Sequence, residues 1–148
     1  MSYESLLRSV DLAGVYHMPH GDDAKIVKAA EANGFVVFPV DLRRANNRED
    51  LLDTVAHDMA FPEWFGHNYD ALFDCLCDLG WRPGEGYLVL LRHCDNVHGR
   101  AEADFVNTLK IFEQAAAEWR EDGIPFWCLV DMQADGIAWL PTVGPGEQ

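Results

Sequence analysis

Three apolar runs, separated by segments with helical spacing, limit the fold that this chain can adopt. The runs are FVVFPVDL (residues 35–42), YLVLL (87–91) and IPFWCLVDM (124–132). YLVLL is apolar at every position, as in a strand buried on both faces of a sheet. Pro39 has no N–H for a ladder hydrogen bond, so the first run is expected at a sheet edge or a bulge. Strands separated by helices pair in parallel through right-handed crossovers. The pattern therefore predicts a three-layer α/β fold with a three-stranded parallel core sheet packed by helices.

The stretches between these runs have apolar residues at helical spacing, which predicts helices there. Asn46 or Asn47 can cap a helix in which apolar residues recur at three- and four-residue steps as far as Met59. Residues 104–120 predict the longest helix, with one apolar stripe. Residues 92–100 are rich in His, Asn and Gly and are expected as a connecting loop.

An N-terminal extension precedes the first apolar run and offers one further strand and helices of its own. Residues 5–12 predict a short helix and residues 14–18 a short strand, and Asp22 or Asp23 can cap a second helix. No repeat or linker divides the chain, so a single domain is expected over residues 1–148. Its parts are the extension (1–33), the core (34–132) and a C-terminal tail (133–148).

The segment Phe61–Trp81, FPEWFGHNYDALFDCLCDLGW, predicts an aromatic loop that leads into a short helix. Asn68 is a good N-cap for a helix that begins at Tyr69. Apolar residues then recur at helical spacing until Gly80, a residue type that suits the C′ position.

Acidic residues dominate the same region. Asp70, Asp74 and Asp78 lie four residues apart, so they rise along one side of the predicted helix. Like charges at this spacing destabilise a helix by roughly 0.2–0.5 kcal/mol per pair. From residue 49 to residue 81 there are eight acids and neither Lys nor Arg, within a chain of net charge −14. This charge argues against binding to nucleic acid or anionic lipid through phosphates and favours a cationic partner, although solubility alone also explains acidic surfaces.

The sequence PEWFGHNYDALFDCL, followed closely by GW, resembles the signature of the barstar family, which are intracellular protein inhibitors of barnase-type ribonucleases. The positions that match in type and order are Pro62, Glu63, Gly66, Asn68, Asp70, Ala71, Leu72, Asp74, Cys75, Leu76, Gly80 and Trp81. Aromatic residues are kept at Trp64 and Phe65, and Phe73 replaces the family's usual Trp. The order of predicted elements extends the resemblance over roughly residues 34–132.

The resemblance implies that this segment binds a partner protein. A ribonuclease active site holds phosphates in a cationic pocket, so a rigid helix that carries two carboxylates can occupy it in place of RNA. Asp74 would be the central anchor, with Asp70 beside it. The further contacts that the resemblance implies are Trp64, Phe73 and Trp81 as aromatic groups, and Asn68, Tyr69 and Gly80 as backbone or rim contacts.

One position departs from the family pattern. Gln114 stands where the family usually has an interface glutamate, and Glu113 lies just before it. Together with Phe73, this departure indicates a divergent ribonuclease or a related toxin domain delivered by competing cells, against which the chain would act as an immunity protein.

Two other functions fit parts of the pattern. Paired carboxylates can bind a divalent cation or act as acid and base in an enzyme. However, the chain has neither a glycine-rich phosphate loop nor a nucleophile elbow. An acidic adaptor for a basic protein other than a nuclease would account for the charge alone. His57 and His67 lie near the acidic segment, but isolated surface histidines are the more common outcome.

The cysteines and the N-terminus bear on the cellular compartment. The N-terminus has no basic n-region or apolar h-region, and no long apolar run occurs, so we expect a cytoplasmic protein with reduced thiols. Cys75, Cys77, His93 and Cys94 could bind zinc, but Cys75-x-Cys77 lacks the two-residue spacing of a zinc ribbon. We expect no cofactor.

Overall fold

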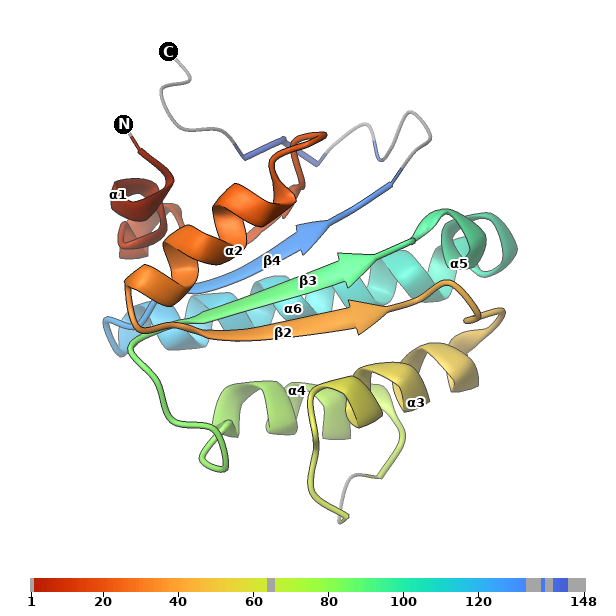
Figure 1. Cartoon of the computed structure of the whole chain (residues 1–148). Coiled ribbons are helices and arrows are strands. Elements are labelled where there is room, and N and C mark those ends of the chain that lie inside the picture. The colour runs from red at the N-terminus through yellow and green to blue at the C-terminus, as the bar shows by residue number, and fades with distance from the viewer. Residues whose placement is uncertain (1, 64–65, 133–136, 138–139, 144–148) are drawn as a thin grey trace.

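The computed structural model of the chain describes residues 2–63, 66–132, 137 and 140–143. Its elements alternate between helix and strand along much of the chain (Figure 1). In order they are α1 (Tyr3–Leu7), the 3₁₀ turn η1 (Val10–Leu12), β1 (Val15–His17), α2 (Asp23–Ala32), β2 (Val36–Asp41), α3 (Arg48–Asp58), α4 (Tyr69–Asp78), β3 (Tyr87–Arg92), α5 (Asp95–Arg100), α6 (Glu102–Glu121) and β4 (Phe126–Val130).

A four-stranded parallel sheet with the strand order β1-β4-β3-β2 forms the centre of the fold. Parallel pairing of the three predicted strands is confirmed, with Val89 of β3 opposite Phe38 of β2 and Cys128 of β4. The sheet has four strands and not only the three of the predicted core, because β1, the further strand that the N-terminal extension was expected to offer, pairs with β4 and becomes an edge of the same sheet. The extension is therefore part of the sheet.

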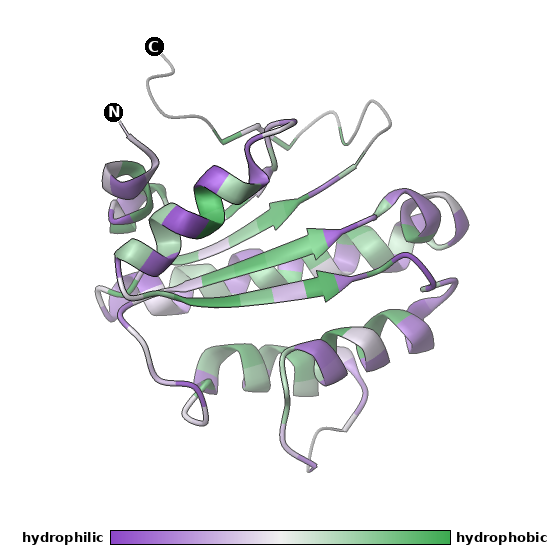
Figure 2. Ribbon diagram, in the orientation of Figure 1, coloured by the Kyte–Doolittle hydropathy of each residue, from purple (hydrophilic) through white to green (hydrophobic). Residues whose placement is uncertain are grey.

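Helices cover both faces of the sheet, which gives the three layers expected from the sequence (Figure 1). Every residue of β4 and all but the last of β3 are buried, as strands covered on both faces require. Phe38, Val89 and Cys128 belong to the larger core cluster, which they share with residues of α3, α4, α5 and α6. Leu88 and Trp127 face the other way, into a second cluster with residues of α1 and α2. Figure 2 shows the strands predominantly in the hydrophobic colour, whereas the helices carry both colours.

Side chains close part of each sheet edge. The edge position expected from Pro39 is confirmed, since β2 is the outer strand on its side. Next to it, the Asp58 carboxylate of α3 accepts a hydrogen bond from the N–H of Asp41 at 3.0 Å. At the opposite edge, the Glu113 carboxylate of α6 accepts a hydrogen bond from the N–H of Val15 at 3.1 Å. These contacts satisfy edge N–H groups that could otherwise pair with another chain.

Three local expectations were wrong. Residues 92–100 are not simply a loop, because they contain α5, whose one buried residue is Val97. The predicted helix over residues 5–12 is instead the short helix α1 followed by the turn η1. At the end of α4 the left-handed residue is Leu79, with φ of 50°, and not Gly80. Leu79 is fully buried, so packing in the core holds it in a conformation that glycine usually takes.

The packing of α2 on the sheet predicts a specific loss of stability. Ile26 is fully buried on the face of α2 that contacts the second core cluster, so Ile26→Ala should lower the free energy of unfolding by about 2–5 kcal/mol. Lys28→Ala, at an exposed position of the same helix, should change it by less than about 0.5 kcal/mol. Urea denaturation measures the free energy of unfolding of both variants. A loss in Ile26→Ala as small as that in Lys28→Ala would show that α2 does not contribute to the core.

Candidate acidic binding surface on α4

The sequence folds α4 with its apolar side inward and its carboxylates outward. Leu72, Cys75 and Leu76 are fully buried in the larger core cluster. Asp70, Asp74 and Asp78 are all exposed. Within residues 2–63, 66–132, 137 and 140–143, none of these three aspartates forms an ion pair with a cationic side chain at 4.0 Å or less. The structure therefore leaves a row of uncompensated negative charge at the position that the sequence indicated.

Asn68 fixes the start of this helix as predicted. Its Oδ1 accepts a hydrogen bond from the N–H of Ala71 at 2.8 Å, and its Nδ2 donates to the carbonyl of Gly66 at 3.3 Å. The side chain of Asn68, a residue expected to supply a backbone or rim contact to a partner, is thus engaged in capping α4. A rigid start of the helix in turn fixes the direction of the carboxylates that follow.

Tyr69 joins α4 to the neighbouring helices. It is half-buried, and its hydroxyl donates to Oδ1 of Asp104 on α6 at 2.8 Å. Arg48 of α3 lies over its ring, with 5.9 Å between the guanidinium carbon and the ring centroid. Burial, followed by the hydrogen bond to Asp104, raises the pKa of Tyr69 to about 12, so the phenol stays protonated at neutral pH. Tyr69 therefore connects α4 to α3 and to α6.

The predicted aromatic contacts have different surroundings. Phe73 is half-buried on α4. Trp81 is also half-buried, donates its Nε1–H to the carbonyl of Met59 at 3.3 Å, and meets the ring of Phe61 edge-on at 5.9 Å between centroids. Trp81 thus ties the end of α4 to the end of α3, while Gly80 beside it is exposed. Trp64 lies outside the described residues.

Gln114 and Glu113 lie on α6 but have separate surroundings. Gln114 is exposed. Glu113 accepts the N–H of Val15 and lies 3.7 Å from Nη2 of Arg120, so its carboxylate is committed to the N-terminal strand. A Cβ atom at Gly14 would lie 3.0 Å from Oε1 of Glu113, so a larger residue at this position would displace the Glu113 carboxylate by a few tenths of an ångström.

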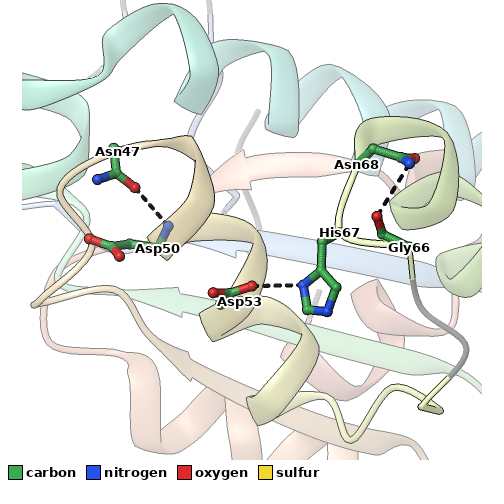
Figure 3. A network of polar contacts seen from close by, with 6 residues as sticks. All are labelled: Asn47, Asp50, Asp53, Gly66, His67 and Asn68. Atoms are coloured by element: carbon green, nitrogen blue, oxygen red, sulfur yellow. Dashed lines mark hydrogen bonds and ion pairs between the residues drawn. The ribbon is translucent and has the colours of Figure 1, made fainter.

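One polar contact at the start of α4 was not anticipated from the sequence. His67 was expected to be an isolated surface histidine; its side chain is exposed, but its Nδ1 lies 2.7 Å from Oδ1 of Asp53 on α3 (Figure 3). The two residues are fourteen positions apart, so only the return of the chain from α3 to α4 brings them together. The pair connects the turn before α4 to the preceding helix.

Unusual backbone conformations flank the same segment. Ala60, His67 and Leu79 have φ values of 57°, 56° and 50°, in the left-handed region. A residue with a Cβ atom pays roughly 1–2 kcal/mol for this conformation. Two of the three frame the loop that leads into α4 and the third ends the helix. Such strain collects at functional sites, because the surrounding structure must hold it in place.

The thiols of α4 are poor nucleophiles and metal ligands at neutral pH. Burial, and then the charges of Asp74 and Asp78, raises the pKa of Cys75 to about 11. Burial, and then Glu118 and Asp74, raises the pKa of Cys77 to about 11. In the described part of the chain, no group of three or more His, Cys, Asp or Glu residues is placed to hold a metal ion. The zinc alternative with Cys75, Cys77, His93 and Cys94 therefore gains no support from the geometry.

A pocket of about 770 Å³ opens between the extension, α6 and Pro141. The carboxylates of α4 do not line it. An enzyme built on Asp70 and Asp74 would need a concave substrate site around both, and this pocket does not supply one. No helix within the described residues is both long and apolar enough to cross a membrane.

The separate roles of Glu113 and Gln114 can be tested by a neighbouring pair of variants. Glu113→Ala leaves the N–H of Val15 and the half-buried guanidinium of Arg120 without this acceptor, so it should lower the free energy of unfolding by about 1–3 kcal/mol. Gln114→Ala should change it by less than about 0.5 kcal/mol. Thermal or urea unfolding measures both. An unchanged stability in Glu113→Ala would contradict the role of this carboxylate in holding β1.

Comparison with solved structures places the fold among larger α/β proteins. Two structures of the ORC2 protein of Aeropyrum pernix, one with ADPNP and ADP and one with ADP, superpose with a TM-score of 0.54 each. Their sequences are 18% and 16% identical to this chain over 87% of its length. The chain spans only 39% and 40% of those two proteins. At this level of identity the likeness concerns the fold alone.

A protein-family comparison covers the strands β2 to β4 and the acidic helix between them. The model of the family described as Barstar (barnase inhibitor) matches residues 35–131, which is about two thirds of the 148 residues. The match begins directly after the N-terminal extension and includes the capped helix α4 with its exposed carboxylates. The chain therefore belongs to the Barstar family.

Proposed function

We propose that this protein inhibits a barnase-type ribonuclease, or a related nuclease toxin, by placing α4 in the cationic active site. The observation that carries the proposal is the exposure of Asp70 and Asp74 without an ion-pair partner among the described residues. A negative side chain with no cation of its own is available to a cation on another protein. Family membership indicates which kind of partner supplies that cation.

The geometry of α4 suits a site that holds phosphates. Asp70 and Asp74 are four residues apart, so their backbones differ by about 6 Å along the helix axis and the two carboxylates point to a similar side. Basic groups in a nuclease cleft can donate charge-assisted hydrogen bonds to both carboxylates at once. Because the helix is already capped and packed, little conformational entropy is lost when it enters the cleft.

Phe73 belongs to the same proposed contact. It lies between Asp70 and Asp74 in the sequence and is half-buried, so part of its ring is accessible beside the carboxylates. Apolar groups around a charge pair exclude water and strengthen the electrostatic attraction. Phe73 in place of the family's usual Trp gives a smaller contact, and Gln114 gives a neutral one, so we propose that the cognate nuclease differs from barnase at the surfaces that meet these positions.

We place this action in the cytoplasm, where an inhibitor would protect the cell from its own nuclease or from a toxin delivered by competitors. An acidic adaptor for another basic protein would use the same surface. The two functions differ in one outcome, because only the inhibitor abolishes RNA cleavage by its partner.

The central test measures RNA cleavage by a panel of purified barnase-type ribonucleases with and without the protein. We expect stoichiometric inhibition of at least one member. Asp74→Ala should weaken that complex by about 2–5 kcal/mol, or roughly 30- to 5,000-fold in Kd, because a desolvated basic group of the nuclease loses its partner. Glu31→Ala removes an exposed charge from α2 on the opposite face of the sheet and should leave Kd nearly unchanged.

The salt dependence of association provides a second readout. Steering by the acidic surface should make the association rate fall steeply between low and physiological ionic strength. Binding without any loss of RNA cleavage would favour the adaptor. Inhibition that survives Asp74→Ala, at a rate indifferent to salt, would show that α4 is not the contact surface.

A further inference from the structure

The loop between α3 and α4 is attached to the helices near both of its ends. Near its start, the N–H of Phe61 donates to the carbonyl of Ala56 at 2.8 Å, and the Phe61 ring packs edge-on against Trp81. At its end, His67 contacts Asp53 of α3, one residue before the cap Asn68 (Figure 3). The first attachment includes a backbone hydrogen bond and apolar packing, and the second includes a contact between two polar side chains.

The second attachment lies at a strained point of the backbone. His67 has φ of 56°, a conformation that a residue with a Cβ atom adopts only when its surroundings hold it there. Its imidazole reaches Asp53 at 2.7 Å, which is the shortest of the side-chain contacts drawn in Figure 3. Gly66 and Asn68 on either side are joined to each other through the amide of Asn68. A contact that holds His67 therefore holds the whole turn from residue 66 to residue 68.

From these observations we infer that Asp53, acting through His67, is a positioning residue for the acidic binding surface of α4. The turn that it holds carries Asn68, whose Oδ1 binds the N–H of Ala71 and so sets the first turn of α4. Asp70 lies within that turn of helix and Asp74 one turn further on. Asp53 thus restricts the start of α4 to the conformation that presents both carboxylates. This inference rests on the proposed function, because the surface that it positions is the proposed contact surface.

The size of the effect follows from exposure. Asp53 and His67 have side chains that are 54% and 61% exposed, so solvent weakens their attraction. Loss of an exposed pair of this kind corresponds to roughly a two- to five-fold change in an equilibrium constant. The change should appear in the dissociation rate, because a less restricted turn weakens the complex after contact without altering long-range attraction by much.

Asp53 also carries a negative charge, which by itself attracts a cationic partner. Glu49→Gln is the matched control, because Glu49 is an exposed acid one turn before Asp53 on the same helix, lines the same surface hollow as Asp53 and His67, and loses one charge with little change in side-chain size. Asp53→Asn is compared with it. His67→Asn keeps a residue type that tolerates the left-handed conformation but is too short to reach Asp53 in the same way.

The experiment measures association and dissociation rates of the full chain against the ribonuclease that it inhibits, for wild type, Asp53→Asn, His67→Asn, the double variant and Glu49→Gln. We expect the dissociation rate to rise two- to five-fold in each single variant at Asp53 or His67, with no further rise in the double variant. Glu49→Gln should change only the association rate. Additive effects of Asp53→Asn and His67→Asn, or an Asp53→Asn profile equal to that of Glu49→Gln, would overturn the inference.

Amide hydrogen exchange of the free protein tests the same inference without a partner. Asp53→Asn and His67→Asn should each speed exchange of the Ala71 amide, which the Asn68 cap protects, and Glu49→Gln should not. Unchanged exchange at Ala71 in both variants would contradict the positioning role even if the nuclease is bound. Failure of the wild-type chain to bind any ribonuclease would count against the proposed function, and the exchange measurement would still decide the role of Asp53.

Discussion

Burial of the two inner strands on both faces is the constraint on which the rest of the structure depends. β3 and β4 carry almost no polar side chain, so each face of the sheet must be covered by helices. One face receives α3, α4, α5 and α6, and the other receives α1 and α2 from the N-terminal extension. The apolar side of α4 is part of this covering, and its burial directs Asp70 and Asp74 to solvent. The position of the acidic surface is thus a consequence of how the sheet is packed.

The chain keeps that surface negative at some cost to its own stability. Three aspartates stand at four-residue spacing on α4, and no described cation pairs with them, although Arg48 and Arg120 take part in contacts elsewhere. Left-handed residues at both ends of the loop and at the end of the helix add backbone strain. The helix cap at Asn68 and the side-chain hydrogen bonds of Tyr69 and Trp81 offset part of these costs. Like charges at this spacing cost roughly 0.2–0.5 kcal/mol per pair, and this cost is consistent with the proposed contact between the carboxylates and a cationic partner.

Local patterns in the sequence were sufficient for much of the fold and for part of the site. The strands and the caps at Asn47 and Asn68 follow from apolar runs and from side chains that bond to their own backbone within three residues. The helix α5 was missed because DNVHGR is polar and only Val97 is buried. Leu79 in place of Gly80 at the left-handed position depends on core packing. The contacts of Asp53 with His67 and of Glu113 with Val15 join residues 14 and 98 positions apart, and no local pattern reports such pairs.

In the proposed complex the partner meets the chain at the acidic side of α4. Backbone amide NMR spectra of the ¹⁵N-labelled protein, recorded with increasing amounts of a catalytically inactive barnase-type ribonuclease, test it most directly. We expect shifts and line broadening to concentrate in residues 66–81, while the amides of α1 and α2 stay unchanged. Perturbations centred on the extension and the pocket beside β1, with α4 unaffected, would contradict it.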